Sequence, residues 1–178
     1  MILYIIEHIN LCIIRKTDEL VEKYATWMNN ESLCHWIGNN RYIKQYKEAE
    51  DWLTRECKDW ELDFIIVEKE HNEPIGICGL THNDITSYLY ITIGEEQYLN
   101  KGLGTEAINL LIKYSFEQLN MHRVELYLNS ENIIALNCYT NIGFIECGRQ
   151  HEADYYNGHY CDIINMEILK KDWINLYK

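Results

Sequence analysis

The sequence of 178 residues lacks any apolar run near the ~18 residues that a membrane-spanning helix requires. Its first segment, Met1 to Glu7, is apolar but has no basic leader, and Glu7 and His8 interrupt it where a signal peptide needs an unbroken apolar region. Proline occurs once, and no repeat, low-complexity stretch or proline-rich linker marks a domain boundary. We therefore expect residues 1–178 to form a single cytoplasmic domain that has no membrane partner.

CxxC spacing is also absent, and the number of cysteines is odd. The seven cysteines are scattered along the chain: Cys12, Cys34, Cys57, Cys78, Cys138, Cys147 and Cys161. This pattern argues against a disulfide framework and against a zinc knuckle. We expect reduced thiols and no bound metal.

Basic residues are few, because 16 Lys and Arg stand against 28 Asp and Glu and give a formal net charge of -12. Such a charge repels phosphate backbones, so we expect no nucleic-acid partner. It favours a cationic substrate only weakly, since many proteins are acidic for solubility alone.

Two kinds of periodicity alternate along the chain. Strand-like alternation covers residues 9–15, 63–68, 75–80, 88–93, 123–128, 144–151 and 162–169. Helical spacing covers residues 17–29, 43–58, 105–119 and 132–141, and a short helix is expected at 171–177. Turns are predicted at Gly38 to Asn40, at His71 to Pro74 and at Asn157-Gly158. These patterns indicate a chain in which strands and helices share one sheet-based fold.

A glycine loop, Lys101-Gly102-Leu103-Gly104, follows a strand and precedes a strongly helical segment. Glycines at a helix start let backbone N–H groups point together at an anion, and the helix dipole adds partial positive charge. The spacing lacks the third glycine of a dinucleotide fingerprint and the Gly-Lys-Ser/Thr of a P-loop. Alone, this loop could equally be an ordinary glycine turn.

A second motif stands about thirty residues after the loop, between two predicted strands. Its characteristic positions are Asn132, Ala135, Tyr139, Gly143 and Phe144. Together with the glycine loop, this segment resembles the second signature of the GNAT superfamily of N-acetyltransferases. Further segments resemble the branch that contains ribosomal-protein N-terminal and spermidine acetyltransferases: Trp27 with Asn29-Asn30, the helix around Trp52, Ile75-Gly76, Gly79-Leu80, residues 119–123 and residues 158–166.

The resemblance implies an α/β (α+β) GNAT fold. Its central sheet would be mixed, mostly antiparallel and twisted, with about seven strands and about four flanking helices. The fourth and fifth strands would splay apart to admit the arm of acetyl-CoA. The implied activity is the acetyl-CoA-dependent N-acetylation of a primary amine by direct attack, which needs no enzyme nucleophile.

The same resemblance implies which residues bind acetyl-CoA. They are Ile91, Thr92 and Ile93 of the fourth strand, the loop residues Leu99, Asn100, Lys101, Gly102, Leu103, Gly104 and Thr105, and Asn132 and Asn137 of the second motif. Leu99 departs from the family, which usually has Arg or Gln there. Because the loop would bind pyrophosphate mainly through backbone N–H groups, this side chain is expected to be dispensable. Asn132 could equally serve only as a helix cap.

Tyr139 is the expected proton donor to the leaving thiolate, although a tyrosine on a short helix is more often a packing residue. The group that takes the proton from the amine is less distinct. His82 and Glu31 are the predicted candidates, with His35 and Glu152 as alternatives, and each could equally be a surface residue.

The acceptor remains open among a protein N-terminus, a polyamine, an aminoglycoside and an amino sugar. The segment Met28 to Tyr46, which contains Trp36, Arg41 and Tyr42, is expected to form part of the acceptor wall, or else only a packed loop. A homodimer is a further expectation from relatives. The alternative from another class is a non-catalytic module that keeps the fold to sense an acyl-CoA or a small ligand.

Overall fold

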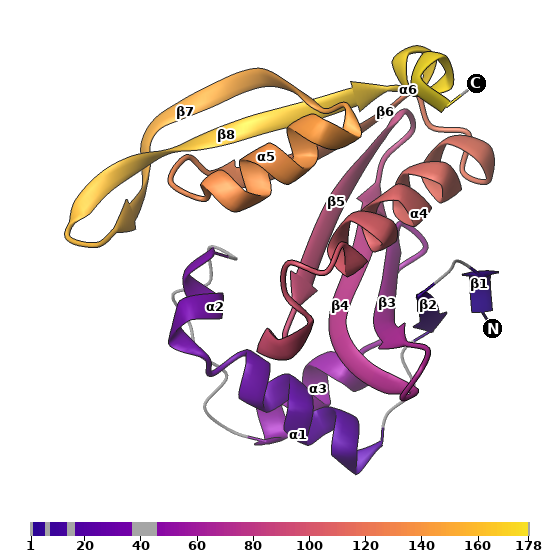
Figure 1. The fold of residues 1–178 in the computed structure, drawn as a ribbon, viewed down its shortest axis with the longest axis vertical. Helices are drawn as coiled ribbons and strands as arrows, with labels where there is room; N and C mark the ends of the chain where they lie inside the picture. Colours follow the sequence, from indigo (N-terminus) through magenta and orange to yellow (C-terminus); the bar gives the residue numbers. More distant parts are fainter. Residues whose placement is uncertain (1, 6–7, 14–16, 37–45, 178) are drawn as a thin grey trace.

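An eight-stranded sheet runs through the described part of the computed structural model, which comprises residues 2–5, 8–13, 17–36 and 46–177 (Figure 1). The strands are β1 (Ile2–Ile5), β2 (Ile9–Ile13), β3 (Glu61–Glu68), β4 (Glu73–His82), β5 (Thr86–Ile93), β6 (Arg123–Asn129), β7 (Ile145–Tyr156) and β8 (His159–Leu169). The helices are α1 (Asp18–Trp27), α2 (Glu31–Trp36), α3 (Tyr46–Thr54), the 3-10 helix η1 (Glu96–Tyr98), α4 (Leu103–Glu117), α5 (Ile133–Ile142) and α6 (Lys170–Tyr177). No helix among these residues is long and apolar enough to cross a membrane.

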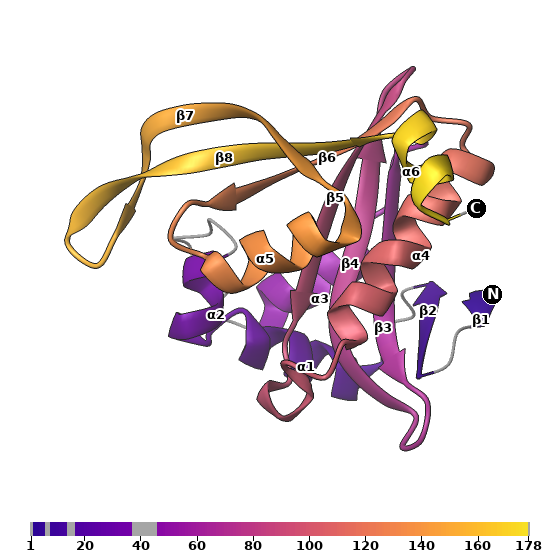
Figure 2. The same cartoon turned by 45° about the horizontal axis from the view of Figure 1, so that its top comes forward.

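The sheet has the order β1-β2-β3-β4-β5-β6-β8-β7, and β5 with β6 is its parallel pair. Helices α4 and α5 lie on one face, whereas α1 and α3 lie on the other (Figures 1 and 2). The core beneath α4 includes Leu89 and Leu126, and the core beneath α1 and α3 includes Ile65 and Ile77. Successive side chains along each strand point to opposite faces of the sheet, so alternate positions enter two separate apolar layers.

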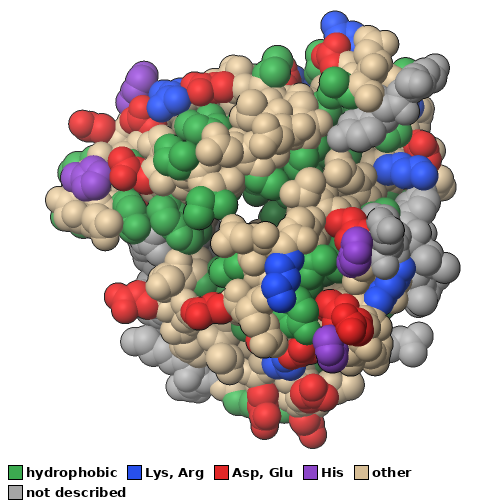
Figure 3. Space-filling model, viewed as in Figure 1, with side chains coloured by type: hydrophobic (Ala, Val, Ile, Leu, Met, Phe, Trp, Pro, Cys, Tyr) green, Lys and Arg blue, Asp and Glu red, His purple; other side chains and the backbone are tan. Residues whose placement is uncertain are grey.

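Strands β5 and β6 pair only at their beginnings. Their register runs from Thr86 opposite Arg123 to Tyr88 opposite Glu125 and then stops. Beyond Tyr88, β5 continues beside β4 as far as Ile93, while β6 stays paired with β8 as far as Asn129. The two strands diverge in Figure 2, and the space-filling view shows an opening through the molecule below α5, beside the end of β5 (Figure 3). The expected splay and the GNAT fold are confirmed.

Several boundaries differ from the sequence-based expectations. The sheet gains an eighth strand, β1, and the helices include α2, which lies within the segment expected to be an acceptor wall. Strand β4 begins at Glu73, so Pro74 lies in the strand rather than in the turn, at a register shift opposite Val67. Strands β7 and β8 extend to a two-residue turn at Asn157 and Gly158, whose φ angles of 47° and 85° suit a tight hairpin. The predicted break at 38–40 lies outside the described residues.

Helix α1 is fixed to the end of β5 by its last residue. Its first turn is capped by Thr17, whose hydroxyl accepts a hydrogen bond from Leu20 N at 3.1 Å. At the other end the buried Trp27 packs flat on Gly94, and its indole N–H donates to Glu95 at 3.1 Å. A Cβ at position 94 would overlap the Trp27 ring. The absence of a side chain at Gly94 therefore determines how closely α1 approaches the sheet.

Gly94→Ala tests this close approach. The added methyl group would clash with the buried Trp27 ring, which has no space to accept it. We therefore expect the free energy of unfolding to fall by about 1–3 kcal/mol. The measurement is urea-induced unfolding followed by tryptophan fluorescence. Gly148→Ala is the control, because its Cβ would lie 3.5 Å from the Asn165 amide, an ordinary contact, and its cost should stay within about 0.5 kcal/mol. Equal stability of both variants would contradict the packing argument.

Candidate active site

The N-terminus of α4 presents free backbone donors. Gly102 is the N-cap residue, with a φ of 80° and no side-chain cap, and the first bond of the helix runs from Glu106 N to Gly102 O. The N–H groups of Leu103, Gly104 and Thr105 therefore have no carbonyl partner within the helix. The helix begins two residues before the predicted Thr105, which places Gly104 in its first turn. Backbone donors grouped at a helix start suit an anion such as a phosphate.

This loop lies over the second half of β5. A Cβ on Gly104 would lie 3.7 Å from Ile93 Cγ1 and 4.0 Å from Ile91 Cδ1. Upstream, Asn100 has a φ of 58°, and the Lys101 ammonium lies 5.3 Å from the centre of the Tyr98 ring. Leu99 is exposed and offers no side-chain donor, so an anion here would rely on the backbone and on Lys101.

A row of backbone groups on β5 faces the gap left by β6. Backbone hydrogen bonds from Asn83 N to Thr86 O and from Gly94 N to Ile75 O flank the β4–β5 pairing. They show that the even-numbered residues of β5 are the ones whose backbone groups bond β4. In an antiparallel ladder these positions alternate. Leu89, Ile91 and Ile93 therefore direct their N–H and C=O groups toward the gap. Thr92 instead turns its backbone groups toward Ile77 of β4, and Leu89 joins the row although sequence reasoning did not single it out.

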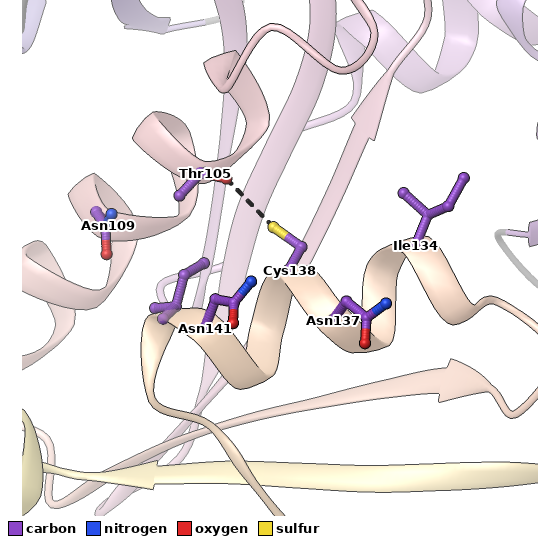
Figure 4. Close-up of a pocket in the computed structure, with 7 residues that line it drawn as sticks. Thr105, Asn109, Ile134, Asn137, Cys138 and Asn141 are labelled. Carbon is purple, nitrogen blue, oxygen red and sulfur yellow. Dashed lines mark hydrogen bonds between the residues drawn. The ribbon is translucent and has the colours of Figure 1, made fainter.

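Helix α5 meets the first turn of α4. Asn132 caps α5, accepting a hydrogen bond from Ala135 N at 3.1 Å through Oδ1, which leaves its amide N–H groups for another partner. The Cys138 thiol lies 3.2 Å from the Thr105 hydroxyl, and these two side chains point at one another (Figure 4). An open groove of about 530 Å³ lies between the helices. Its lining residues are Thr105, Asn109, Ile134, Asn137, Cys138, Asn141 and Ile142.

Two of the predicted residues, Thr105 and Asn137, thus share this groove. Sequence reasoning missed Asn109 and Asn141. The signal that could have found them is their spacing, since each lies four residues after a predicted site residue on the same helix and therefore on the same face.

Tyr139 lies next to Cys138 on α5. Its ring packs edge-on against Phe144, with centroids 5.9 Å apart, and burial raises the pKa of its hydroxyl to about 12. Within the described residues this hydroxyl makes no hydrogen bond. The group is therefore neutral near pH 7 and retains a proton that it can donate.

Comparison with known proteins bears directly on this arrangement. Residues 10–145 match a family described as the acetyltransferase (GNAT) domain. The chain belongs to the GNAT acetyltransferases. It is an N-acetyltransferase, as its relatives are named, and the catalytic interpretation replaces the sensor alternative.

Similar proteins cover most of this acetyltransferase. Spermidine N(1)-acetyltransferase of Vibrio cholerae is 29% identical, covering 79% of this chain and 88% of its own. The putative ribosomal N-acetyltransferase YdaF of Bacillus subtilis is 32% identical and covers 94% of each chain. The structure of the Vibrio cholerae enzyme in complex with CoA and spermine has a TM-score of 0.83 and 25% identity, and covers 94% of this chain and 98% of that one.

The predicted proton acceptors of the acetyltransferase lie on separate elements. His82 ends β4 opposite Ser87 and borders a second pocket with Trp60 and Met121. That pocket contains no residue of the glycine loop. Glu31 is exposed in the first turn of α2, and Glu152 is exposed at a register shift of β7. The structure does not bring these carboxylates and His82 together, and the side chain of His35 is outside the description.

Helix α2 borders the side of the sheet that carries α1. Asn30, just before α2, donates to Glu96 of η1 at 3.3 Å, while Trp36 at its end packs on Tyr156 of β7, with ring centroids 4.9 Å apart. The helix thus connects the turn after β5 with the tip of the β7–β8 hairpin. Arg41 and Tyr42, also expected in this wall, lie outside the described residues.

Proposed function

We propose that this acetyltransferase transfers the acetyl group of acetyl-CoA to a primary amine of a polyamine by direct attack. The single observation that carries the proposal is the arrangement of free N–H groups at the start of α4 beside the unpaired edge of β5. The relative that was solved with CoA and spermine supports both substrates. The net charge of -12 agrees with a polycationic acceptor.

In this mechanism the diphosphate binds the N–H groups of Leu103, Gly104 and Thr105, and the pantetheine arm lies along Leu89, Ile91 and Ile93. A backbone N–H of that row stabilises the oxyanion formed when the amine attacks the thioester carbonyl. The C–N bond forms, the C–S bond breaks, and Tyr139 gives its proton to the leaving thiolate. Glu31 and His82 stay predictions for the group that receives the proton of the amine. The cytoplasmic location and the homodimer also stay predictions.

A second acceptor is favoured by one specific observation. The relative named as a putative ribosomal N-acetyltransferase matches 94% of this chain at 32% identity. The N-terminal amine of a ribosomal protein is therefore the alternative acceptor, and it would use the same cofactor site and the same proton donor.

An acceptor panel separates the two proposals. Purified enzyme with acetyl-CoA is assayed by thiol release against spermine, spermidine, kanamycin and peptides that begin with Ala or Ser. We expect kcat/KM for the polyamines to exceed that for the peptides by at least about tenfold, because the net charge of -12 attracts a substrate with several positive charges more strongly than one with a single amine. Faster acetylation of a peptide would favour the ribosomal alternative, and no thiol release with any amine would contradict the proposed reaction.

Gly104→Val tests the phosphate site. The side chain would stand where the diphosphate approaches the N-terminus of α4, and we expect the Kd for CoA to rise by at least about tenfold. Isothermal titration calorimetry with CoA measures this change. Gly148→Val carries the same substitution on the exposed strand β7 and should bind CoA normally. Unchanged affinity in Gly104→Val, with the fold intact by circular dichroism, would show that the diphosphate lies elsewhere.

Tyr139→Phe tests the proton donor. It removes the hydroxyl but keeps the ring on Phe144, so we expect kcat to fall by about 10²-fold with little change in CoA affinity. Because burial raises the pKa of this hydroxyl to about 12, it stays protonated well above the usual tyrosine range. The kcat of the wild type should therefore show no falling limb up to about pH 10. A falling limb of kcat below about pH 10 that is present in the wild type and absent in Tyr139→Phe would show that the hydroxyl loses its proton at a lower pH than expected.

A further inference from the structure

A buried carboxylate lies on β3, two strands away from the edge that faces the gap. The side chain of Asp63 is 2% exposed. Its Oδ1 accepts a hydrogen bond from the Tyr90 hydroxyl at 2.5 Å, and its Oδ2 lies 2.6 Å from the guanidinium of Arg55. A buried charge is tolerated only when it is paired and hydrogen-bonded, and here both oxygens are engaged.

The bond from Tyr90 crosses an intervening strand. In the register of the sheet, Asp63 lies opposite Gly79, and Gly79 lies opposite Tyr90. A Cβ on Gly79 would come within 2.5 Å of the Tyr90 ring and would overlap the carbonyl oxygen of Leu62. The missing side chain on β4 thus opens a passage through which a residue of β5 reaches β3.

Tyr90 occupies a position where β5 has lost one of its neighbours. The pairing with β6 ends at Tyr88, so among the described strands β4 is the one that pairs with residues 89–93. The free edge is also where Leu89, Ile91 and Ile93 present the groups that the acyl chain would use. A strand that must leave those groups unbonded cannot be fixed by a second ladder, and a side-chain bond across β4 restrains it without occupying them.

The same cluster extends to the helices on that face of the sheet. The guanidinium of Arg55 lies 4.6 Å from the centre of the Trp52 ring, and Trp52 of α3 stacks on Tyr24 of α1 at 4.6 Å. Burial, followed by the hydrogen bond to Asp63, raises the pKa of Tyr90. Its hydroxyl is therefore a neutral donor to Asp63 and not a proton acceptor for the amine.

We infer that Tyr90 is a positioning residue for acetyl transfer, and that its bond to Asp63 holds the free edge of β5 where the row of Leu89, Ile91 and Ile93 can bind the thioester. We name this bond the Tyr90–Asp63 clamp. The inference rests on the proposed function for its effect on rate. The Tyr90 side chain is bonded to Asp63 and packs beneath α1 and α3, so it would act through the backbone of its own strand rather than by contact with the reacting atoms.

Tyr90→Phe removes the clamp and keeps the ring and the Arg55–Asp63 pair. We expect kcat to fall by about tenfold while KM for the amine stays within about twofold, because displaced donors weaken the transition state more than the ground state. Tyr88→Phe is the matched control, since it removes a hydroxyl on the same strand and face, and within the described residues that hydroxyl makes no hydrogen bond. Its kinetics should equal those of the wild type.

All rates are referred to the concentration of sites that bind CoA, so that loss of folded protein is not counted as loss of rate. A lower melting temperature with unchanged kcat per binding site would reduce Tyr90 to a packing residue and overturn the inference. Equal losses in Tyr90→Phe and Tyr88→Phe would also overturn it.

Amide hydrogen exchange tests the clamp without turnover. In unliganded protein, Tyr90→Phe should speed exchange at Thr92 and Gly94, whose N–H groups bond β4, by at least about fivefold relative to the wild type, and Tyr88→Phe should not, because only the former frees the unpaired end of β5. Unchanged exchange would contradict the clamp even in an active enzyme. Faster exchange in a protein that acetylates no amine would retain the clamp and reject the proposed function instead.

Discussion

The separation of β5 from β6 after Tyr88 is the constraint on which the rest of the structure depends. A sheet normally satisfies both edges of an inner strand, and an unpaired backbone group out of water has a high free-energy cost. Here each strand keeps its outer partner, so the sheet stays continuous on both sides of the gap. The free backbone groups between them can then bind an extended substrate as a strand would be bound.

The second element of the site follows from the same geometry. A chain that leaves β5 at Ile93 passes through η1 and enters α4 at Leu103, so the start of the helix returns to the edge that has just been opened. Glycine at position 102 adopts the left-handed conformation that this return requires, and it places no side chain over the free donors. One loop thus places helix N–H groups and strand N–H groups within the length of one extended ligand.

Most of these parts could be predicted from the sequence, because each depends on a pattern of a few neighbouring residues. The cap at Asn132, the glycine loop and the Asn157-Gly158 turn are short-range signals that a pattern can show. Helix α2 was missed because its six residues are too short for a helical period to emerge. The last five residues of β7 and the first three of β8 were missed for another reason: most of them are exposed, so no apolar alternation marks them.

Contacts between side chains on different strands could not be predicted from the sequence. Asp63, Gly79 and Tyr90 lie in one row only because three strands take a particular register, and a shift of one residue would turn Tyr90 to the opposite face. Their residue types are unremarkable alone: an acid, a glycine and a tyrosine in strands. The structure was needed to show that the glycine is the passage between the other two.

Charge adds a long-range component that the site geometry does not contain. With 28 acidic and 16 basic side chains, an excess of 12 carboxylates cannot be neutralised by Lys or Arg within the chain. Acidic side chains are spread over the face seen in Figure 3. Such a field attracts a polycation from beyond contact distance and weakens within about 8–10 Å at physiological salt. It would raise the association rate of a polyamine more than that of a peptide with one amine, although both could use the same donors once bound.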